Sequence, residues 1–208
     1  MTDVLDHILT GNRHYRNQTL THDPTFFDTL SKGQSPSVLW IGCADSRIPE
    51  TTICASQPGE LFVHRNIANC VHAGDINAAS VVEYAVTHLK VKKVVVCGHT
   101  SCGGAVASLG DAELGEVLDS WLHPVRELRR KHKSELDALP DDNARAVRVA
   151  ELNVRQSIEV LRRHPAVRRA ASDRGLTVHG LIYDLGLGEL RVLEESGKGK
   201  GNGLWSPN

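Results

Sequence analysis

The run from Val91 to Cys97 constrains the fold of this chain more than any other segment. Its residues are mostly β-branched and apolar, and the run is short, which is typical of a strand buried on both faces of a parallel sheet. It leads directly into Gly98–Gly104 (Gly-His-Thr-Ser-Cys-Gly-Gly), which we expect to be a tight turn that opens a helix. A buried strand followed by such a turn indicates an α/β architecture.

Further predicted strands and helices alternate along the chain. The remaining strands are expected over 37–42, 60–65, 176–183 and 189–193, and the main helices over 3–16, 76–90, 113–134 and 143–163. The segment from Asn17 to Pro36 is polar and is predicted to be irregular. This order predicts an α/β fold with a central, mostly parallel β-sheet flanked by helices. We expect three parts: an N-terminal helical arm (1–30), an α/β domain (31–196) and a flexible Gly-rich tail (197–208).

Composition excludes several classes of partner. The chain has 24 Lys and Arg against 25 Asp and Glu, so it has no excess of positive charge that would attract nucleic acid. The arginine-rich stretch Arg126–Lys133 is interspersed with glutamate and is predicted to be a solvated helix face. No apolar run has the length of a membrane span, and no leader pattern is evident. Five cysteines without a regular framework indicate reduced thiols, so we expect a cytoplasmic protein.

Three residues with metal-ligand chemistry follow predicted strands. Cys43 comes directly after the strand over 37–42, and His99 and Cys102 lie in the turn after Val91–Cys97. Ligands in parallel α/β sheets bind beyond the carboxyl ends of the strands, so we expect these side chains to converge. Two thiolates and one imidazole suit zinc and leave a fourth position for water. The alternative is two buried thiols and a polar histidine; the coincidence at two strand ends favours the metal.

Asp45 and Arg47 follow the first of these residues at alternate positions. In an extended stretch Cys43, Asp45 and Arg47 point to the same side. Arg47 would then keep Asp45 ionised and oriented through a bidentate pair. The alternative, a surface ion pair that contributes little to stability, is less favoured beside a metal ligand.

Together these segments resemble the signature segments of the β-carbonic anhydrases. The three segments are Cys43-Ala44-Asp45-Ser46-Arg47, His64-Arg65-Asn66-Ile67-Ala68-Asn69 and Gly98-His99-Thr100-Ser101-Cys102-Gly103-Gly104. Their order and spacing also match, and the resemblance is strong over about residues 30–110. Ala44 replaces a serine common in the family, at a position that is not a ligand. Any one segment would be a weak signal, whereas the set is specific.

The resemblance implies a zinc-dependent enzyme for the reversible hydration of carbon dioxide to bicarbonate and a proton. It implies one Zn²⁺ per chain on Cys43, His99 and Cys102, and a catalytic dyad of Asp45 and Arg47. It also implies that Gln34, Phe62 and Tyr84 line the substrate pocket, some of them supplied by a neighbouring subunit. The partners would be carbon dioxide, bicarbonate and further copies of the chain, as a homodimer or homotetramer whose N-terminal helices wrap over one another.

The expected chemistry follows from charge. Zinc lowers the pKa of its bound water to about 7 in a carbonic anhydrase with three histidine ligands, and the hydroxide attacks carbon dioxide. Two thiolates cancel the charge of the dication, so the water here should be less acidic and activity should rise with pH. Asp45 would accept a hydrogen bond that orients the hydroxide. In the alternative state, Asp45 itself coordinates zinc and closes the site.

Trp40, Arg65 and Tyr183 match the positions of a bicarbonate-binding pocket that stabilises the closed state in some bacterial relatives. An indole, a guanidinium and a phenol together suit a small oxyanion. The alternative assigns Trp40 to the core, Arg65 to an interface ion pair and Tyr183 to a strand. His64 and His72 are expected to be structural rather than proton carriers.

Three other functions are compatible with parts of the pattern. The same scaffold in related zinc enzymes hydrolyses carbon disulfide or carbonyl sulfide. A non-catalytic bicarbonate- or zinc-binding module is disfavoured because the set of Cys43, Asp45, Arg47, His99 and Cys102 is intact. A thiol redox enzyme is disfavoured because the chain has no Cys-x-x-Cys pair.

Overall fold

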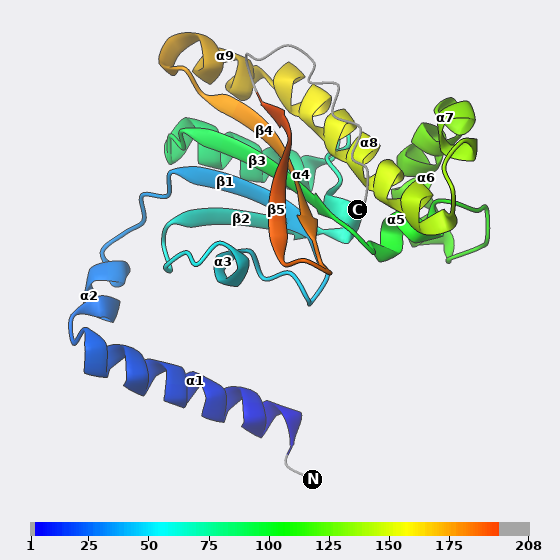
Figure 1. Cartoon of the computed structure of the whole chain (residues 1–208). Helices are drawn as coiled ribbons and strands as arrows, with labels where there is room; N and C mark the ends of the chain where they lie inside the picture. Colours follow the sequence, from blue (N-terminus) through cyan, green and yellow to red (C-terminus); the bar gives the residue numbers. More distant parts are fainter. Residues whose placement is uncertain (1–2, 196–208) are drawn as a thin grey trace. The chain divides into compact units, whose positions relative to one another are not determined.

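A five-stranded sheet forms the centre of the structure, a computed structural model that describes residues 3–195 (Figure 1). Across the sheet the strands lie in the order β2-β1-β3-β4-β5. The first four are mutually parallel, and β5 pairs antiparallel with β4. The mostly parallel α/β sheet expected from the sequence is confirmed. The strands are β1 (Val38–Cys43), β2 (Leu61–Asn66), β3 (Lys93–His99), β4 (Thr177–Asp184) and β5 (Glu189–Glu195).

The chain divides into two compact units, Met1–Ser35 and Pro36–Asn208. The first contains two helices, α1 (Val4–His22) and α2 (Phe26–Ser31). The helical elements of the second are α3 (Glu50–Ile53), η1 (Ile67–Asn69), α4 (Ile76–Glu83), the π-helical turn η2 (Tyr84–His88), α5 (Gly103–Ala107), α6 (Glu116–Lys131), α7 (Lys133–Asp137), α8 (Asp142–Arg163) and α9 (Pro165–Arg174). None of the described helices has both the length and the apolar composition needed to cross a membrane.

The N-terminal arm is more helical than its polar sequence indicates. The Asp3 side chain accepts a hydrogen bond from the Leu5 amide at 3.1 Å and caps α1, which then continues to His22. The prediction of irregular structure over 17–36 is wrong for 17–22 and for Phe26–Ser31. The polar residues after Tyr15 are compatible with a helix, and the break comes only at Asp23-Pro24. No residue of α1 is buried.

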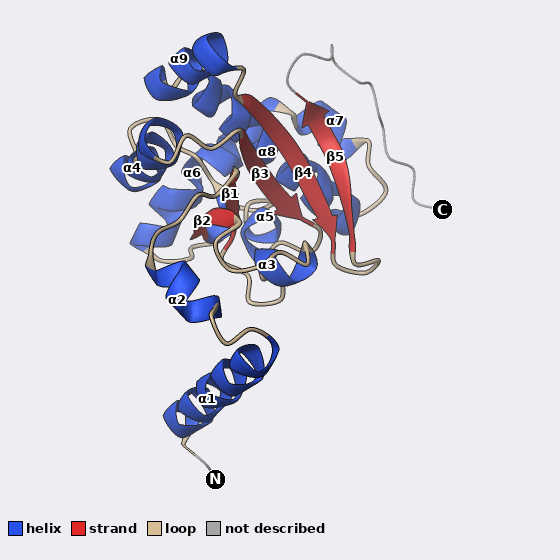
Figure 2. Cartoon of the chain, turned by 90° about the vertical axis from the view of Figure 1, so that its left-hand side faces the viewer, coloured by secondary structure: helices blue, strands red, loops and turns tan. Residues whose placement is uncertain are grey.

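One face of the sheet is covered by α4, α8 and α9. Leu39, Ile41 and Val96 of the strands pack in one cluster with Val82 of α4 and Ile158 of α8. The long helix α8 runs beside β3 and β4 (Figure 2). On the opposite face a smaller cluster joins Trp40, Val95 and Cys97 with partly buried residues that include Ile53 of α3. The hydrophobic core on the face covered by α4, α8 and α9 is therefore larger than the core on the opposite face.

Two further differences from the sequence predictions concern arginine-rich segments. The helix α9 was not predicted, although Pro165 at its first turn and Gly175 at its end (φ 70°) are typical helix boundaries. The prediction that Arg126–Lys133 forms a solvated face is wrong for Arg126, which is buried. Its guanidinium donates to the Ala112 carbonyl at 2.8 Å and pairs with Asp119 at 2.9 Å, which compensates for its burial.

The Gly-rich tail predicted over 197–208 lies outside the described residues.

Candidate metal centre

The candidate metal centre lies where the strand order of the sheet reverses direction. Cys43 is the last residue of β1 and His99 is the last residue of β3. The chain leaves β1 for β2 on one side and returns to β3 on the other side of β1. The carboxyl ends of strands at such a reversal leave a crevice in which ligands bind in open α/β sheets. The fold therefore brings two predicted ligands, distant in sequence, to one place.

Cys43, His99 and Cys102 form one compact group. The two sulfurs and a ring nitrogen of His99 lie within 4.8 Å of one another. Tetrahedral zinc, with bonds of about 2.0–2.3 Å, separates its ligand atoms by roughly 3.5 Å, so small adjustments suffice to bind it. Cys102 and His99 are almost fully buried, and Cys102 directly precedes α5. The convergence predicted from the two strand ends is present.

The orientation of His99 suits a metal ligand. A backbone carbonyl only accepts hydrogen bonds, so the 2.8 Å contact between His99 Nδ1 and the Thr100 carbonyl oxygen makes Nδ1 the donor. The proton is then on Nδ1, and Nε2 has its lone pair free. Within the described residues Nε2 is buried and has no hydrogen-bond partner. A buried acceptor of this kind normally has a partner, and a metal ion beside the two sulfurs would supply one.

The two thiols also favour a cation between them. Hydrogen bonding from Cys102 is the main cause that lowers the pKa of the Cys43 thiol to about 4. The same pair raises the pKa of Cys102, because its hydrogen bond to Cys43, its burial and the nearby negative charge all oppose a second thiolate. A divalent cation removes that opposition, since both sulfurs then face positive charge. The donor set therefore fits zinc.

Asp45 and Arg47 form a bidentate ion pair. The carboxylate of Asp45 accepts hydrogen bonds from Arg47 Nε at 2.9 Å and from Nη2 at 2.7 Å. It also accepts one from the Arg47 backbone N–H at 3.0 Å, which closes a turn. The expectation of an extended stretch is therefore wrong here, because β1 ends at Cys43. Arg47 Nη2 also donates to the Ser101 carbonyl at 3.2 Å, which ties the pair to the turn that bears Cys102.

The Asp45 carboxylate lies beside the three ligand atoms. Its Oδ2 is 3.9 Å from His99 Nε2. The hydrogen bonds from Arg47 are the main cause that keeps the pKa of Asp45 well below its ordinary value. Asp45 is therefore anionic at neutral pH, and it presents an acceptor next to the candidate metal position.

Arg65, Trp40 and Tyr183 lie around the same end of the sheet. The Arg65 guanidinium donates to the carbonyl of Cys43 at 2.8 Å and to that of Asp45 at 2.6 Å. The Trp40 indole lies over Gly42, where an added Cβ would be 2.8 Å from Nε1. Tyr183 packs against the cluster that contains Trp40. Arg65 (β2) and Gly42 (β1) are register partners, as are His99 (β3) and Tyr183 (β4).

Two of the three predicted pocket residues, Phe62 and Tyr84, are not gathered at this site within one chain. Phe62 and Tyr84 contact each other, with ring centroids 5.7 Å apart. Phe62 is the register partner of Leu39, four residues before Cys43, which is about 13 Å along the strand. Gln34 belongs to the unit Met1–Ser35 and is exposed. Their role as pocket residues stays a prediction.

Two residues without an assigned role in the sequence analysis shape the site. The Thr100 hydroxyl accepts from the Leu185 amide at 2.9 Å, which fixes the carbonyl that orients His99. The Asn66 side chain bridges the amide and the carbonyl of Cys70, each at 2.8 Å. It thereby holds Ala68 and Asn69 in left-handed conformations, with φ of 61° and 48°. Both belong to the quoted segments, but a segment alone does not reveal which atom a side chain contacts.

Comparison with known proteins identifies relatives over most of the chain. A family model described as carbonic anhydrase matches residues 38–190. A carbonic anhydrase of Candida albicans is 46% identical over 193 residues, which cover 92% of this chain and 68% of that protein. One from Emericella nidulans is 44% identical over 189 residues, covering 90% of this chain and 82% of that protein.

A solved structure shares the fold over nearly the whole chain. It belongs to a study of two tetrameric β-carbonic anhydrases from the filamentous ascomycete Sordaria macrospora. It superposes with a TM-score of 0.90 at 48% identity, covering 95% of this chain and 98% of the other.

Proposed function

The chain belongs to the β-carbonic anhydrase family, and from this membership we propose specific roles for the residues at its metal centre. It catalyses the reversible hydration of carbon dioxide to bicarbonate and a proton. The enzymes of this family are zinc enzymes, and the group of Cys43, His99 and Cys102 is compatible with zinc. We propose that these three residues bind one Zn²⁺ per chain. The buried His99 Nε2, unpartnered within residues 3–195, is the observation that carries this proposal.

The bound zinc would supply an acidified water as the nucleophile for carbon dioxide. Asp45 contributes an anionic acceptor whose Oδ2 is 3.9 Å from His99 Nε2. Asp45 would accept a hydrogen bond from the nucleophile and so hold it in a fixed orientation toward the carbon atom. Arg47 fixes the plane of that carboxylate through two side-chain contacts. Arg47 therefore positions Asp45 rather than reacting itself.

The same geometry suggests how the site is inhibited. In the structure Asp45 is paired with Arg47, so becoming a fourth metal ligand would require it to leave that pair. We propose that bicarbonate between Trp40, Arg65 and Tyr183 favours this change. Arg65 donates to the carbonyls of both Cys43 and Asp45, so an anion that draws the guanidinium away releases the Asp45 turn.

The substrate pocket would be completed by a second copy of the chain. Phe62 and Tyr84 contact each other but lie near the opposite ends of the strands from their own Cys43. We propose that they, with Gln34, line the pocket of a neighbouring subunit. The exposed Tyr84 ring is free to take part in such an interface. The tetrameric Sordaria macrospora relatives favour a homotetramer over a homodimer.

The remaining assignments follow the sequence. We propose a helical arm over 1–30 that wraps a partner subunit, a zinc-binding catalytic domain over 31–196 and a cytoplasmic location. The five cysteines are all free thiols in the structure, which agrees with a reducing compartment. No observation favours hydrolysis of carbon disulfide or carbonyl sulfide, a non-catalytic module or a thiol redox enzyme.

Stopped-flow hydration of carbon dioxide, combined with metal analysis of the same preparation, tests this function. We expect activity that disappears when a chelator removes zinc and returns when zinc is restored. Full activity in a preparation without zinc would refute the proposed centre. Turnover of carbonyl sulfide faster than that of carbon dioxide would refute the assigned substrate.

A further inference from the structure

A second cavity lies apart from the metal centre. It has a volume of about 310 Å³ and lies between the loop that follows η1, helix α4 and the C-terminal half of α8. Cys43, Asp45, His99 and Cys102 do not line it. Its walls are mostly aliphatic, and its polar groups are His72, Gln156, Arg163 and His164. An apolar pocket with a few convergent polar groups is the usual form of a small-molecule site.

Two histidines of this cavity have a buried nitrogen without a partner. Within the described part of the chain, His72 Nε2 and His164 Nδ1 are buried and form no hydrogen bond. Buried polar atoms in folded proteins nearly always have a partner, so two exceptions in one cavity require an explanation. Both rings must turn for these nitrogens to face the cavity, where a bound molecule with oxygen atoms would then supply their partners. Burial lowers the pKa of His72, so at neutral pH its ring is uncharged and has one donor and one acceptor nitrogen.

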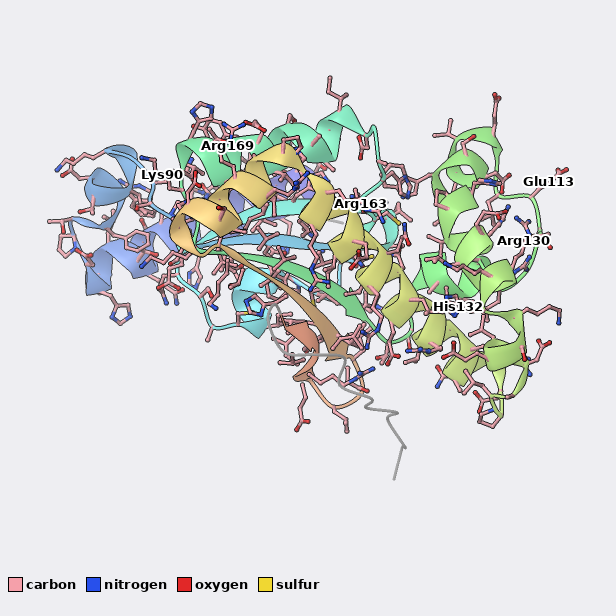
Figure 3. The ribbon with its side chains drawn as sticks, turned by 90° about the horizontal axis from the view of Figure 1, so that it is seen from above. Lys90, Glu113, Arg130, His132, Arg163 and Arg169 are labelled. Carbon is pink, nitrogen blue, oxygen red and sulfur yellow. The ribbon has the colours of Figure 1, made fainter. Side chains whose placement is uncertain are left out.

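The charge of the cavity favours an anion. Among the described residues that line it, Arg163 is the only one with a permanent charge, and none is acidic. Figure 3 shows Arg163 on α8, close to its C-terminal end. The charge of Asp75 acts on His72, but the Asp75 side chain accepts a hydrogen bond from the Asn77 amide at 2.9 Å and caps α4. A guanidinium beside two imidazoles is suited to bind a carboxylate.

We propose that this cavity binds a small monocarboxylate with a compact apolar body. The apolar body would lie among Val82, Val160 and Leu161, and the carboxylate would face His72, His164 and Arg163. The volume is at the lower end of the range for ligand pockets, which suits a molecule the size of benzoate and excludes a nucleotide or a folded peptide.

The wall of the cavity is held in place without a ligand. The His72 ring packs on Trp121, with centroids 4.5 Å apart, and the Trp121 Nε1 donates to the Ile67 carbonyl at 2.9 Å. The backbone N–H of Val71 donates to Ser157 Oγ of α8 at 3.1 Å. Apart from the two histidine rings the site is therefore preformed, and a preformed site loses little conformational entropy when a ligand binds.

Calorimetric titration of the zinc-loaded enzyme with benzoate tests the proposal. We expect a dissociation constant of about 1 mM or lower, as is usual for a ligand with nine heavy atoms. Val160→Trp fills the cavity and should abolish this binding, whereas Val117→Trp, at an exposed position of α6, should not. Both variants should keep their carbon dioxide hydration rate and thermal midpoint. Crystals soaked with 4-bromobenzoate should show anomalous bromine density between α4 and α8.

A second pair of variants tests the carboxylate. Arg163→Met should weaken benzoate binding about fivefold or more. Arg162→Met is the matched control, because Arg162 pairs with Glu159 and does not line the cavity. Benzyl alcohol, which lacks the charge, should bind the wild-type enzyme more weakly than benzoate does.

The proposal is wrong if benzoate does not bind the wild-type enzyme at concentrations up to about 20 mM, well above the expected dissociation constant. It is also wrong if the Val160→Trp and Val117→Trp variants bind benzoate equally, since the molecule would then occupy another site such as the metal centre. Dissociation of the oligomer in Val160→Trp alone would show that a neighbouring copy covers the cavity and would equally overturn the proposal. Loss of binding in Arg163→Met but not in Arg162→Met supports it even if Val160→Trp is unstable.

Discussion

His99 donates its Nδ1 proton to the carbonyl of the very next residue, Thr100, at 2.8 Å. This contact leaves Nε2 as a lone pair that faces the sulfurs of Cys43 and Cys102. The carbonyl is itself held, because Thr100 is joined to Leu185 through its hydroxyl and to Tyr183 through its amide. This local hydrogen bond orients the imidazole ring and leaves Nε2 available to a metal ion even when none is bound.

Asp45→Asn should lower kcat/KM for carbon dioxide hydration by about 100-fold and leave the zinc content unchanged. Asparagine has the same shape, but it loses the negative charge and the bidentate pair with Arg47. Stopped-flow kinetics and metal analysis measure both effects. Asp142→Asn is the control, because Asp142 forms an exposed ion pair at the start of α8. Wild-type activity in the Asp45 variant would remove Asp45 from the mechanism.

Arg47→Ala should reduce kcat uniformly between about pH 6 and 9 without introducing a new titration there. The hydrogen bonds from Arg47 hold the pKa of Asp45 below its ordinary value of 3.8, and without them that pKa rises toward 3.8. A carboxyl with such a pKa is still ionised at pH 6, so orientation is lost and charge is not. Arg47→Lys should restore only part of the rate because lysine cannot form the two-pronged pair. A new inflection near pH 7 would contradict this account.

The activity of the wild-type enzyme should rise with pH from about 6 to 9. Two thiolate ligands cancel the charge of a divalent cation, so the water that it binds ionises at higher pH than at a site with neutral ligands. Asp45 does not contribute to this rise, because its depressed pKa keeps it ionised over the whole range. Rates should be measured in buffers of constant ionic strength. A flat profile over that range would be inconsistent with the proposed ligand set.

Trp40→Phe should weaken inhibition by bicarbonate while preserving the core. Phenylalanine keeps most of the apolar contacts that Trp40 makes with Val95 and Cys97 but removes the indole N–H that lies over Gly42. Initial rates at rising bicarbonate concentration give the inhibition constant. Trp121→Phe is the matched control, since Trp121 belongs to a different cluster. If the two variants are inhibited like the wild type, the pocket of Trp40, Arg65 and Tyr183 does not regulate the enzyme.

Gly98→Ala should lower stability, by about 1–3 kcal/mol where unfolding is reversible. A Cβ at this position would lie 2.9 Å from Val154 Cγ2 of α8 and 3.0 Å from Ile182 Cδ1 of β4. The urea midpoint at fixed protein concentration reports the change. Gly110→Ala should have little effect, because nothing lies within 4 Å of the added atom. Equal midpoints for the two variants would show that α8 and β3 can separate to accommodate the methyl group.

The fold and the convergence of Cys43, His99 and Cys102 were largely predictable because both depend on local patterns. Short apolar runs identified the strands, and Cys43 and His99 could be assigned to a shared edge because parallel strands end together. The turn at Asp45 was not predictable, because it depends on which side-chain atoms meet the Arg47 amide. The helix α9 was missed because charged residues obscure the apolar spacing of Ala166, Val167 and Ala170.

The burial and the contacts of individual side chains were the hardest features to predict from the sequence. The burial of Arg126 is not evident from the sequence, since one partner, Ala112, lies in the loop before α6 and the other, Asp119, lies two turns earlier in the same helix. Phe62 and Tyr84 are named as pocket residues only by family resemblance, and within one chain they lie well away from Cys43.

The zinc content of the purified enzyme tests the central claim most directly. Metal analysis by mass spectrometry should give one zinc per chain in the wild type. His99→Ala should lose most of the zinc, whereas the control variant His123→Ala, at an exposed position on α6, should retain it. A wild-type protein without zinc, or a His99→Ala variant that retains one zinc per chain, would show that Cys43, His99 and Cys102 do not form the metal centre.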